Sequence, residues 1–175
     1  MSRIQNRRAF FRRGLSPLYL PHYDSLCEIL GDKWQPYQGL RSFEKQDTMY
    51  ARGRTTVPTG KQYIVTNAKG GESAHNYGCA SDWTIFMEGV PLWLSAGDPR
   101  WEEYENACEK VGLRWGGSFV SLVDCYHNEL PISVPWKRVA KVLESSGQEG
   151  MVKFIKDKSG FGSSGEEPGD DFDEV

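Results

Sequence analysis

The sequence predicts an α+β fold, because stretches with helical periodicity are interrupted by short runs of the strand type. Apolar side chains recur every three or four positions in 22–30 and in 100–111, as on one face of an α-helix. The runs 61–68 and 83–88 instead alternate apolar side chains with others, which is typical of half-buried strands. Periodicity alone leaves more than one α+β arrangement open.

The length and composition are those of a single soluble domain. A chain of 175 residues, 38% hydrophobic and 26% charged, is long enough to bury a sizeable core. The net charge of −3 argues against a nucleic-acid ligand. No apolar run reaches the length of a membrane span.

The charges are distributed unevenly, and this divides the chain into three parts. Five arginines lie within a basic N-terminal segment, 1–14, and six acidic residues lie within 166–174. The domain itself is expected over 15–158. The tail 159–175 is expected to be disordered, because Gly, Ser, Pro and acids replace apolar residues there. The basic segment is interpreted as a solvated arm or short helix; attachment to anionic lipid or wall polymer is the alternative.

Proline and glycine mark the first elements of the domain. Pro21 opens the predicted helix 22–30 and Gly31 closes it. Residues 34–40 indicate a short strand, which Pro36 favours at the edge of a sheet because proline lacks the N–H of a ladder.

A helix, a loop and a strand are expected next. Ser42 is a candidate N-cap for a helix over 43–51, whose Glu44 favours the first turn. The Gly and Pro content of 53–60 predicts a loop. The apolar alternation of 61–68 predicts that a strand follows it.

The second half of the chain continues in the same way. Residues 83–88 are predicted to form a strand, and 89–98 a loop rich in Gly and Pro. The helix 100–111 carries several glutamates, which we interpret as its solvated face. Residues 134–141 and 148–155 indicate one or two short helices.

Two pairs of a histidine and an acid form the candidate site. His75 precedes Asp82 by seven positions, so on a straight strand they would face opposite ways, and Gly78 could supply the necessary bend. Asp124 precedes His127 by three. A catalytic zinc ion takes three protein ligands and leaves its fourth position to water. His75, Asp82 and His127 could therefore bind zinc while Asp124 accepts a proton, as in a hydrolase.

The other candidate ligands are interpreted as structural. His22 lies in the first turn of a predicted helix, where a surface or capping role is expected. The four cysteines lack Cys-x-x-Cys spacing, so a separate structural zinc site is not expected. A disulfide between Cys79 and Cys125 stays open, although scattered cysteines in a chain without an export signal more often stay reduced.

The surroundings of these residues resemble a known family. Residues 73–82 match the Ser-x-His-(x)6-Asp signature of zinc peptidases that cut bacterial cell-wall peptides. Upstream, 39–42 (Gly-Leu-Arg-Ser) resembles the L-alanyl-D-glutamate endopeptidase branch, which includes many phage endolysins. Downstream, 112–117 (Gly-Leu-Arg-Trp-Gly-Gly) leads into Asp124-x-x-His127 as in the closing segment of the family. The family also contains D-alanyl-D-alanine dipeptidases and carboxypeptidases.

This resemblance implies a specific fold and site. The fold is a small, mainly antiparallel sheet that carries a zinc site, with helices packed on one side. In the implied site Asp124 is the general base and Arg41 holds the substrate and stabilises the charge on the attacked carbonyl. The implied ligands of Zn²⁺ are His75, Asp82 and His127. Members often carry Glu in place of Asp124, and a shorter acid must lie closer to the water.

The expected function is that of a zinc-dependent peptidoglycan endopeptidase, a phage endolysin that hydrolyses the L-alanyl-D-glutamate bond of the stem peptide. A D-alanyl-D-alanine carboxypeptidase is one alternative. A non-catalytic zinc-bearing binding domain is another, because the hedgehog signalling domain shares the zinc arrangement without a peptidase role. Asp124 and Arg41 favour the enzyme.

The N-terminus has no hydrophobic stretch after its basic residues, so a secretory signal is not expected. We expect a monomer that is made in the cytoplasm of the host bacterium and reaches the wall after release through a holin.

Overall fold

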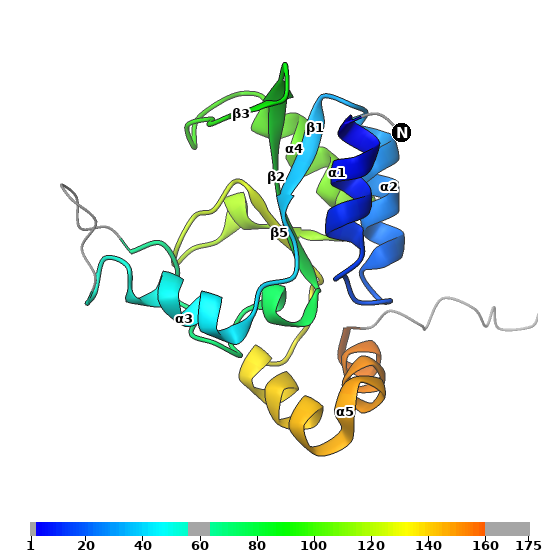
Figure 1. Ribbon diagram of the computed structural model, residues 1–175, viewed down its shortest axis with the longest axis vertical. Helices are drawn as coiled ribbons and strands as arrows, with labels where there is room; N and C mark the ends of the chain where they lie inside the picture. The colour runs from blue at the N-terminus through cyan, green and yellow to red at the C-terminus, as the bar shows by residue number, and fades with distance from the viewer. Residues whose placement is uncertain (1–2, 56–63, 160–175) are drawn as a thin grey trace, which may run out of the picture.

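A computed structural model describes residues 3–55 and 64–159 of the chain (Figure 1). Helices and a small sheet alternate along it, which confirms the α+β prediction. The elements in order are α1 (Arg3–Arg12), α2 (Leu20–Leu30), β1 (Trp34–Gln38), α3 (Phe43–Ala51), the 3-10 turn η1 (Ala74–Tyr77), β2 (Ala80–Met87), β3 (Val90–Leu92), α4 (Trp101–Lys110), β4 (Arg114–Trp115), the 3-10 turn η2 (Gly116–Ser118), β5 (His127–Glu129) and α5 (Trp136–Ser159).

The sheet is antiparallel throughout and has β2 at its centre. Its strand order is β1-β2-β5-β4, and β3 pairs with the far end of β2. β1 lies at an edge of this order, as Pro36 predicts. A small antiparallel sheet is therefore confirmed.

The register of the three neighbouring strands aligns a row of polar side chains. Asp82 on β2 lies opposite His127 on β5 and, on its other side, opposite Gln38 on β1. A register irregularity between Pro36 and Gln38 brings Gln38 into this row. The row crosses the middle of the sheet.

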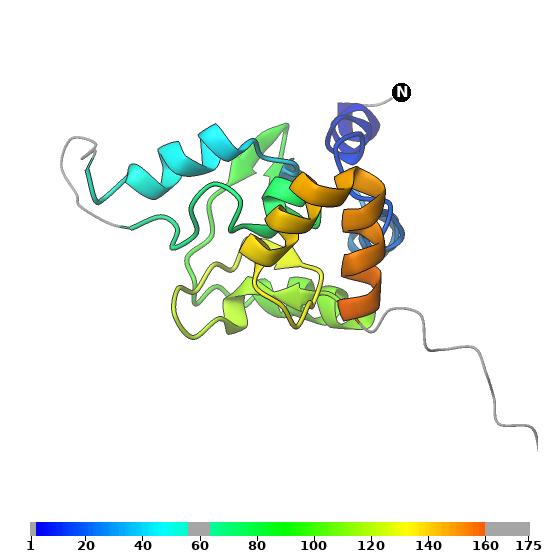
Figure 2. The ribbon, with the colours of Figure 1, turned by 90° about the horizontal axis from the view of Figure 1, so that it is seen from below.

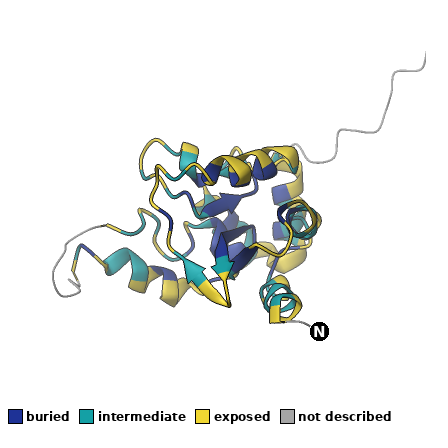
Figure 3. Cartoon of the chain, turned by 90° about the horizontal axis from the view of Figure 1, so that it is seen from above, coloured by how far each residue is buried: buried dark blue, intermediate teal, exposed yellow. Residues whose placement is uncertain are grey.

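The core lies between the sheet and the helices α2 and α4. Trp83 of β2 contacts Tyr23 of α2, with ring centroids 5.4 Å apart. Trp34 of β1 stacks on Tyr104 of α4 at 5.1 Å and also contacts Trp101. Figure 3 shows the buried residues concentrated on the strands and on the inner sides of these helices. These aromatic side chains therefore make up much of the core packing at this face.

The basic N-terminal segment forms α1, which lies beside α2 and β1 (Figure 1). The guanidinium of Arg8 donates hydrogen bonds to the carbonyls of Cys27, Gly31 and Trp34, where α2 ends and β1 begins. Arg12 forms a two-pronged ion pair with Asp24 of α2. Two of the arginines therefore bind neighbouring parts of the protein.

The prediction of a strand over 61–68 is wrong for the part that the structure describes. Residues 64–68 have no strand partner, and 61–63 lie outside the described residues. Side chains take the place of a ladder: Arg54 donates to the carbonyl of Thr66, and Gln46 donates to the carbonyl of Ala68. Polar side chains thus supply hydrogen bonds to backbone carbonyls of this segment, whose alternating apolar side chains suggested a strand.

The prediction of a loop over 89–98 missed β3. Glu88 and Gly89 both have positive φ, 53° and 83°, and form the tight turn of a hairpin between β2 and β3. Positive φ is unusual for glutamate, so the sequence carries only half of the usual turn signal.

The C-terminal part folds into α5, which is divided by a kink at Gly147 (φ 65°) into two helical segments at an angle (Figure 2). Its first residue, Trp136, stacks on Tyr77 of η1 with centroids 5.5 Å apart. Apart from Ser159, the last residue of α5, the predicted disordered tail lies outside the described residues. Within the described chain, every helix is too short or too polar to cross a bilayer.

A buried polar network lies beneath the sheet on the side of the helices. Asn128 of β5 is 0% exposed; its side chain accepts a hydrogen bond from the Tyr19 hydroxyl and donates to that of Tyr104. The hydroxyl of Ser81 bonds Tyr19 at 2.6 Å and accepts from the indole N–H of Trp83 at 2.6 Å. Polar groups thus fill this buried position.

We expect Asn128→Ala to lower the free energy of unfolding by more than about 2 kcal/mol, because it removes one hydrogen-bond partner from each of the buried hydroxyls of Tyr19 and Tyr104. Urea denaturation measures the change. Asn67→Ala, which removes an exposed amide, should stay within about 0.5 kcal/mol of the wild type. Equal stability of the two variants would contradict this role of the network.

Candidate metal centre

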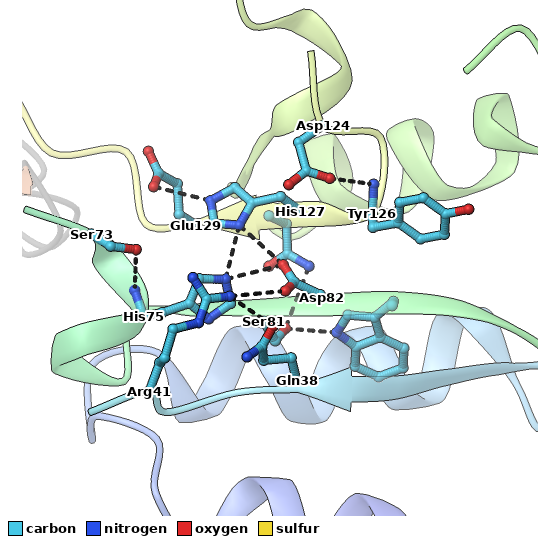
Figure 4. A network of polar contacts seen from close by, with 12 residues as sticks. Gln38, Arg41, Ser73, His75, Ser81, Asp82, Asp124, Tyr126, His127 and Glu129 are labelled. Atoms are coloured by element: carbon cyan, nitrogen blue, oxygen red, sulfur yellow. Dashed lines mark hydrogen bonds and ion pairs between the residues drawn. The ribbon is translucent and has the colours of Figure 1, made fainter. Parts of the chain in front are cut away.

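His75 is presented by the short turn η1 just before β2. Ser73 caps this turn by accepting the N–H of His75, and Gly78 ends it in the left-handed conformation, with φ 66° and ψ 24°. The chain then enters β2, on which Asp82 points back toward the turn (Figure 4). This confirms that the chain bends between His75 and Asp82 and that Gly78 supplies the bend.

Three potential ligand atoms meet at one point of the sheet. Nε2 of His75 lies 3.0 Å from Oδ1 of Asp82 and 3.1 Å from Nδ1 of His127. Nδ1 of His127 lies 3.2 Å from the same oxygen of Asp82. All three side chains are buried. The residues that the sequence singled out as ligands are therefore gathered in a triangle (Figure 4).

This triangle fits a small tetrahedral metal ion. Zinc binds nitrogen and oxygen ligands at about 2.0–2.1 Å, which places neighbouring donor atoms of a tetrahedron about 3.3 Å apart. The observed separations of 3.0, 3.1 and 3.2 Å are close to that value. Two imidazoles and one carboxylate are also a donor set that zinc accepts, and three ligands leave one position open.

Hydrogen bonds orient both imidazoles. Nδ1 of His75 lies 2.7 Å from the carbonyl oxygen of Gly39, which can only accept, so this nitrogen carries the hydrogen. Nε2 of His127 lies 3.1 Å from Oε2 of Glu129. Each ring thus turns its other nitrogen toward Asp82, as ligation requires.

Arg41 lies beside the triangle, where the chain leaves β1. Its Nη2 is 3.4 Å from Oδ2 of Asp82, the carboxylate oxygen that faces away from the histidine pair. Gln38 and Gln46 accept hydrogen bonds from the two Nη atoms at 2.7 and 2.6 Å. Burial lowers the pKa of the Arg41 guanidinium, and the charge of Asp82 partly offsets this. Among the described residues, the buried Nε of Arg41 has no hydrogen-bond partner.

Asp124 lies next to His127 but outside the triangle (Figure 4). Its carboxylate accepts the backbone N–H of Tyr126 at 3.3 Å, and its own N–H bonds the carbonyl of Gly116. A Cβ on Gly116 would lie 2.4 Å from the Asp124 carbonyl oxygen, so this close approach requires glycine. Burial and the charge of Asp82 raise the pKa of the Asp124 carboxyl above its ordinary value. That direction makes Asp124 a better proton acceptor.

The charges of the triangle stabilise one another. Burial alone would raise the pKa of Asp82, but the charges and hydrogen bonds of His75 and His127 outweigh it and hold that pKa far below its usual range. Burial would also lower the pKa of His127, but the hydrogen bonds and charges of Asp82 and Glu129 raise it to about 10. The site therefore attracts positive charge.

Sequence reasoning missed the residues around the triangle, Gln38 and Glu129 above all. Glu129 follows His127 by two positions, so on a strand the two side chains share a face. That spacing was a usable signal, but it required β5 to be recognised as a strand. Gln38 lies only three positions before Arg41, but its place opposite Asp82 depends on the register of β1 on β2, which no local pattern reveals.

The remaining candidates lie apart from the site. His22 contacts the carbonyl oxygen of Val111 at 2.5 Å and links α2 to the end of α4, in agreement with a structural role. All four cysteines are free, so the possible disulfide between Cys79 and Cys125 is not formed. Among the described residues, the triangle is the one group of histidines, cysteines and acids arranged to hold a metal.

Comparisons with known proteins match the part of the chain that contains the site. A family model described as D-alanyl-D-alanine carboxypeptidase matches residues 66–130, which include the triangle and Asp124. The peptidoglycan L-alanyl-D-glutamate endopeptidase CwlK of Bacillus subtilis (strain 168) is 37% identical over 100 residues. That match covers 53% of this chain and 58% of CwlK, so the chain spans little more than half of the length of this relative.

A solved structure is also similar. The crystal structure of the L-Ala D-Glu endopeptidase ChiX of Serratia marcescens matches with a TM-score of 0.49 and 23% sequence identity. The match covers 71% of this chain and 86% of ChiX.

We expect Gly78→Ala to destabilise the protein by about 2–5 kcal/mol, from a left-handed backbone (about 1–2 kcal/mol) and from steric overlap (about 1–3 kcal/mol). A Cβ at this position would lie 2.5 Å from the carbonyl oxygen of Gly14. Gly89→Ala is the control, because φ is 83° there but only the end of the Arg3 side chain lies within 4 Å of the added Cβ, at 3.8 Å. It should lose only the backbone part, about 1–2 kcal/mol. Equal losses in urea denaturation would show that the contact with Gly14 is unimportant.

Proposed function

We propose that the chain belongs to the peptidase family of D-alanyl-D-alanine carboxypeptidases and L-alanyl-D-glutamate endopeptidases and that it is a zinc-dependent peptidoglycan endopeptidase. The observation that carries the proposal is the convergence of His75, Asp82 and His127 on one point, with Asp124 and Arg41 beside it. The proposed substrate bond, between L-alanine and D-glutamate of the stem peptide, follows the activity in the name of CwlK.

The three ligand residues suit a hydrolytic metal. When bound, zinc lowers the pKa of a coordinated water to about 7 and polarises a carbonyl group. His75 and His127 contribute neutral nitrogens, and Asp82 contributes one negative charge. The protein therefore leaves part of the charge of a divalent ion uncompensated, which favours the stabilisation of a developing oxyanion.

Asp124 is proposed to move the proton. Its carboxylate lies beside His127, held by the N–H of Tyr126, and is not one of the three converging ligands. It accepts the proton that the attacking water loses and delivers it to the nitrogen of the departing D-glutamate. Its raised pKa supports this role, because a base must hold the proton until the amine leaves.

Arg41 is proposed to bind the substrate carbonyl as its oxygen becomes negative. A guanidinium stays charged and donates in fixed directions, so it can stabilise an oxyanion without reorganising. Gln38 and Gln46 hold both Nη atoms in place. The N–H of Nε, which is unpartnered in the described residues, supplies a donor.

Two alternatives are separated by their products. A carboxypeptidase, the activity in the description of the matching family model, would release only a terminal D-alanine. A zinc-bearing binding domain would release nothing. A phage origin and release through a holin are part of the proposal. Co-expression in a bacterium with and without a holin, followed by measurement of cell lysis, tests the release through a holin.

Digestion of purified peptidoglycan by the zinc-loaded protein should produce new carboxyl ends on L-alanine and new amino ends on D-glutamate, identified by mass spectrometry. Chelator treatment should abolish them. Asp124→Asn should keep bound zinc and lower turnover by about 10²–10⁴-fold, because it removes the proton acceptor. Asp157→Asn, an exposed acid on α5, is the control. Undiminished activity of Asp124→Asn would refute its role, and loss of terminal D-alanine alone would identify a carboxypeptidase.

Arg41→Lys should lower kcat by about 10²–10³-fold with zinc still bound, because lysine keeps the charge but loses the fixed donors. Arg100→Lys makes the same exchange at an exposed arginine that pairs with Asp98, and it should behave as the wild type. Steady-state kinetics on a stem peptide give the comparison. A change in KM without a change in kcat would assign Arg41 to substrate binding only.

A further inference from the structure

Three side chains form a connected group beside His127. Glu129 and Phe119 contact its ring, and Arg114 contacts both of them. We infer that Glu129, held by Arg114, is a positioning residue that fixes the ring of His127 for the metal and thereby sets the metal affinity of the site. This inference rests on the proposed metal centre and assigns a role to residues that the proposed reaction does not use.

Glu129 uses both of its carboxylate oxygens. Oε2 lies 3.1 Å from Nε2 of His127, and Oε1 accepts a hydrogen bond from Nη2 of Arg114. Glu129 is only 6% exposed, although it is ionic. A buried carboxylate is retained only where partners replace its water, and here one of the two partners is the candidate ligand itself.

Arg114 holds Glu129 from β4, the strand next to β5 at the end of the strand order. The two residues lie opposite each other in the β4–β5 register, and the side chain of Arg114 is 51% exposed. Its guanidinium also lies over the ring of Phe119, 4.8 Å from the centroid. That ring contacts His127 with centroids 5.7 Å apart. Arg114 therefore supports His127 along two routes, one ionic and one aromatic.

The hydrogen bond to Glu129 decides which nitrogen of His127 faces the metal point. A carboxylate accepts from Nε2–H, so the neutral ring presents the lone pair of Nδ1 toward Asp82 and His75. A ring flip would place a carbon against Glu129 and lose the bond. Carboxylates in this relation to a ligating histidine orient the ring and raise its basicity.

A purely structural role is the competing explanation, because a cross-strand ion pair also joins β4 to β5. The two explanations differ in what they predict for metal binding. A structural pair affects the stability of the metal-free protein. A positioning residue affects the zinc dissociation constant even where the metal-free fold is intact.

Competition with a chromogenic chelator measures the zinc dissociation constant without any substrate. Glu129→Ala should weaken zinc binding by about 10–100-fold. The zinc dissociation constant of Glu129→Gln should lie between those of Glu129→Ala and the wild type, because the amide keeps an acceptor for His127 but loses the charge. Asp24→Asn is the matched control, because the carboxylate of Asp24 is also held by an arginine, Arg12, but far from the site. The zinc affinity of this variant should equal that of the wild type.

Arg114→Ala tests the outer support. It leaves the Glu129–His127 bond in place but removes the charge that holds the carboxylate, so a loss of less than about tenfold is expected. The Arg114→Ala/Glu129→Ala double variant should bind zinc almost as tightly as Glu129→Ala alone, because both substitutions act through His127. Thermal unfolding of the metal-free variants shows whether each still folds. If Glu129→Ala does not fold, Arg114→Ala carries the test.

Folded Glu129 and Arg114 variants with the zinc affinity of the wild type would overturn the inference and leave the proposed function untouched. A wild type that binds zinc but cuts no peptidoglycan would overturn the proposed function, while the affinity series would still decide the role of Glu129. A wild type that binds no zinc would overturn both.

Discussion

The pairing of β2 with β5 is the constraint on which the site depends. Antiparallel pairing places Asp82 directly opposite His127, so a carboxylate and an imidazole that are 45 positions apart meet by backbone hydrogen bonds alone. Pairing with β1 adds Gln38 to the same row. A shift of one residue in either pairing would turn these side chains to the opposite face. Much of the core packing under β2 can therefore be understood as holding this register.

The two faces of β2 have different tasks. Trp83 and Ile85 point into the aromatic core formed with α2 and α4, and Asp82 points to the opposite, polar face. The histidines on that face are buried as well, so their water is replaced by Gly39, Glu129 and one another. In a buried polar cluster of this kind, charges interact more strongly than they do in water, and this holds for a bound cation as well.

Sequence reasoning found the parts of the structure that are encoded locally. Caps and breakers such as Ser42 and Gly31 mark helix ends through their own backbone chemistry, and the odd spacing of His75 and Asp82 required the bend at Gly78. Strand partners are encoded nowhere locally. A strand over 61–68 was predicted, but in 64–68 hydrogen bonds from side chains of other segments take the place of a ladder.

The same limit applied to the candidate site. The residues that converge were identified by type and spacing, with the help of a resemblance. Their supporting residues were not: Gln38 comes beside Asp82 only through the pairing of β1 with β2, and the spacing of His127 and Glu129 indicates a shared face only once β5 is known to be a strand. Both are charged or polar residues in short strands, where propensity gives little warning of burial.

The use of Arg8 changes how the basic N-terminal segment must be studied. Its side chain is only 17% exposed and serves as a cap for the carbonyls at the end of α2, so one of the five positive charges is not displayed to a polyanion. Deleting the segment would expose those carbonyls and loosen the start of β1. A truncated protein would therefore report on folding and on wall attachment together, whereas neutralising the exposed Arg3 and Arg13 would change the surface charge alone.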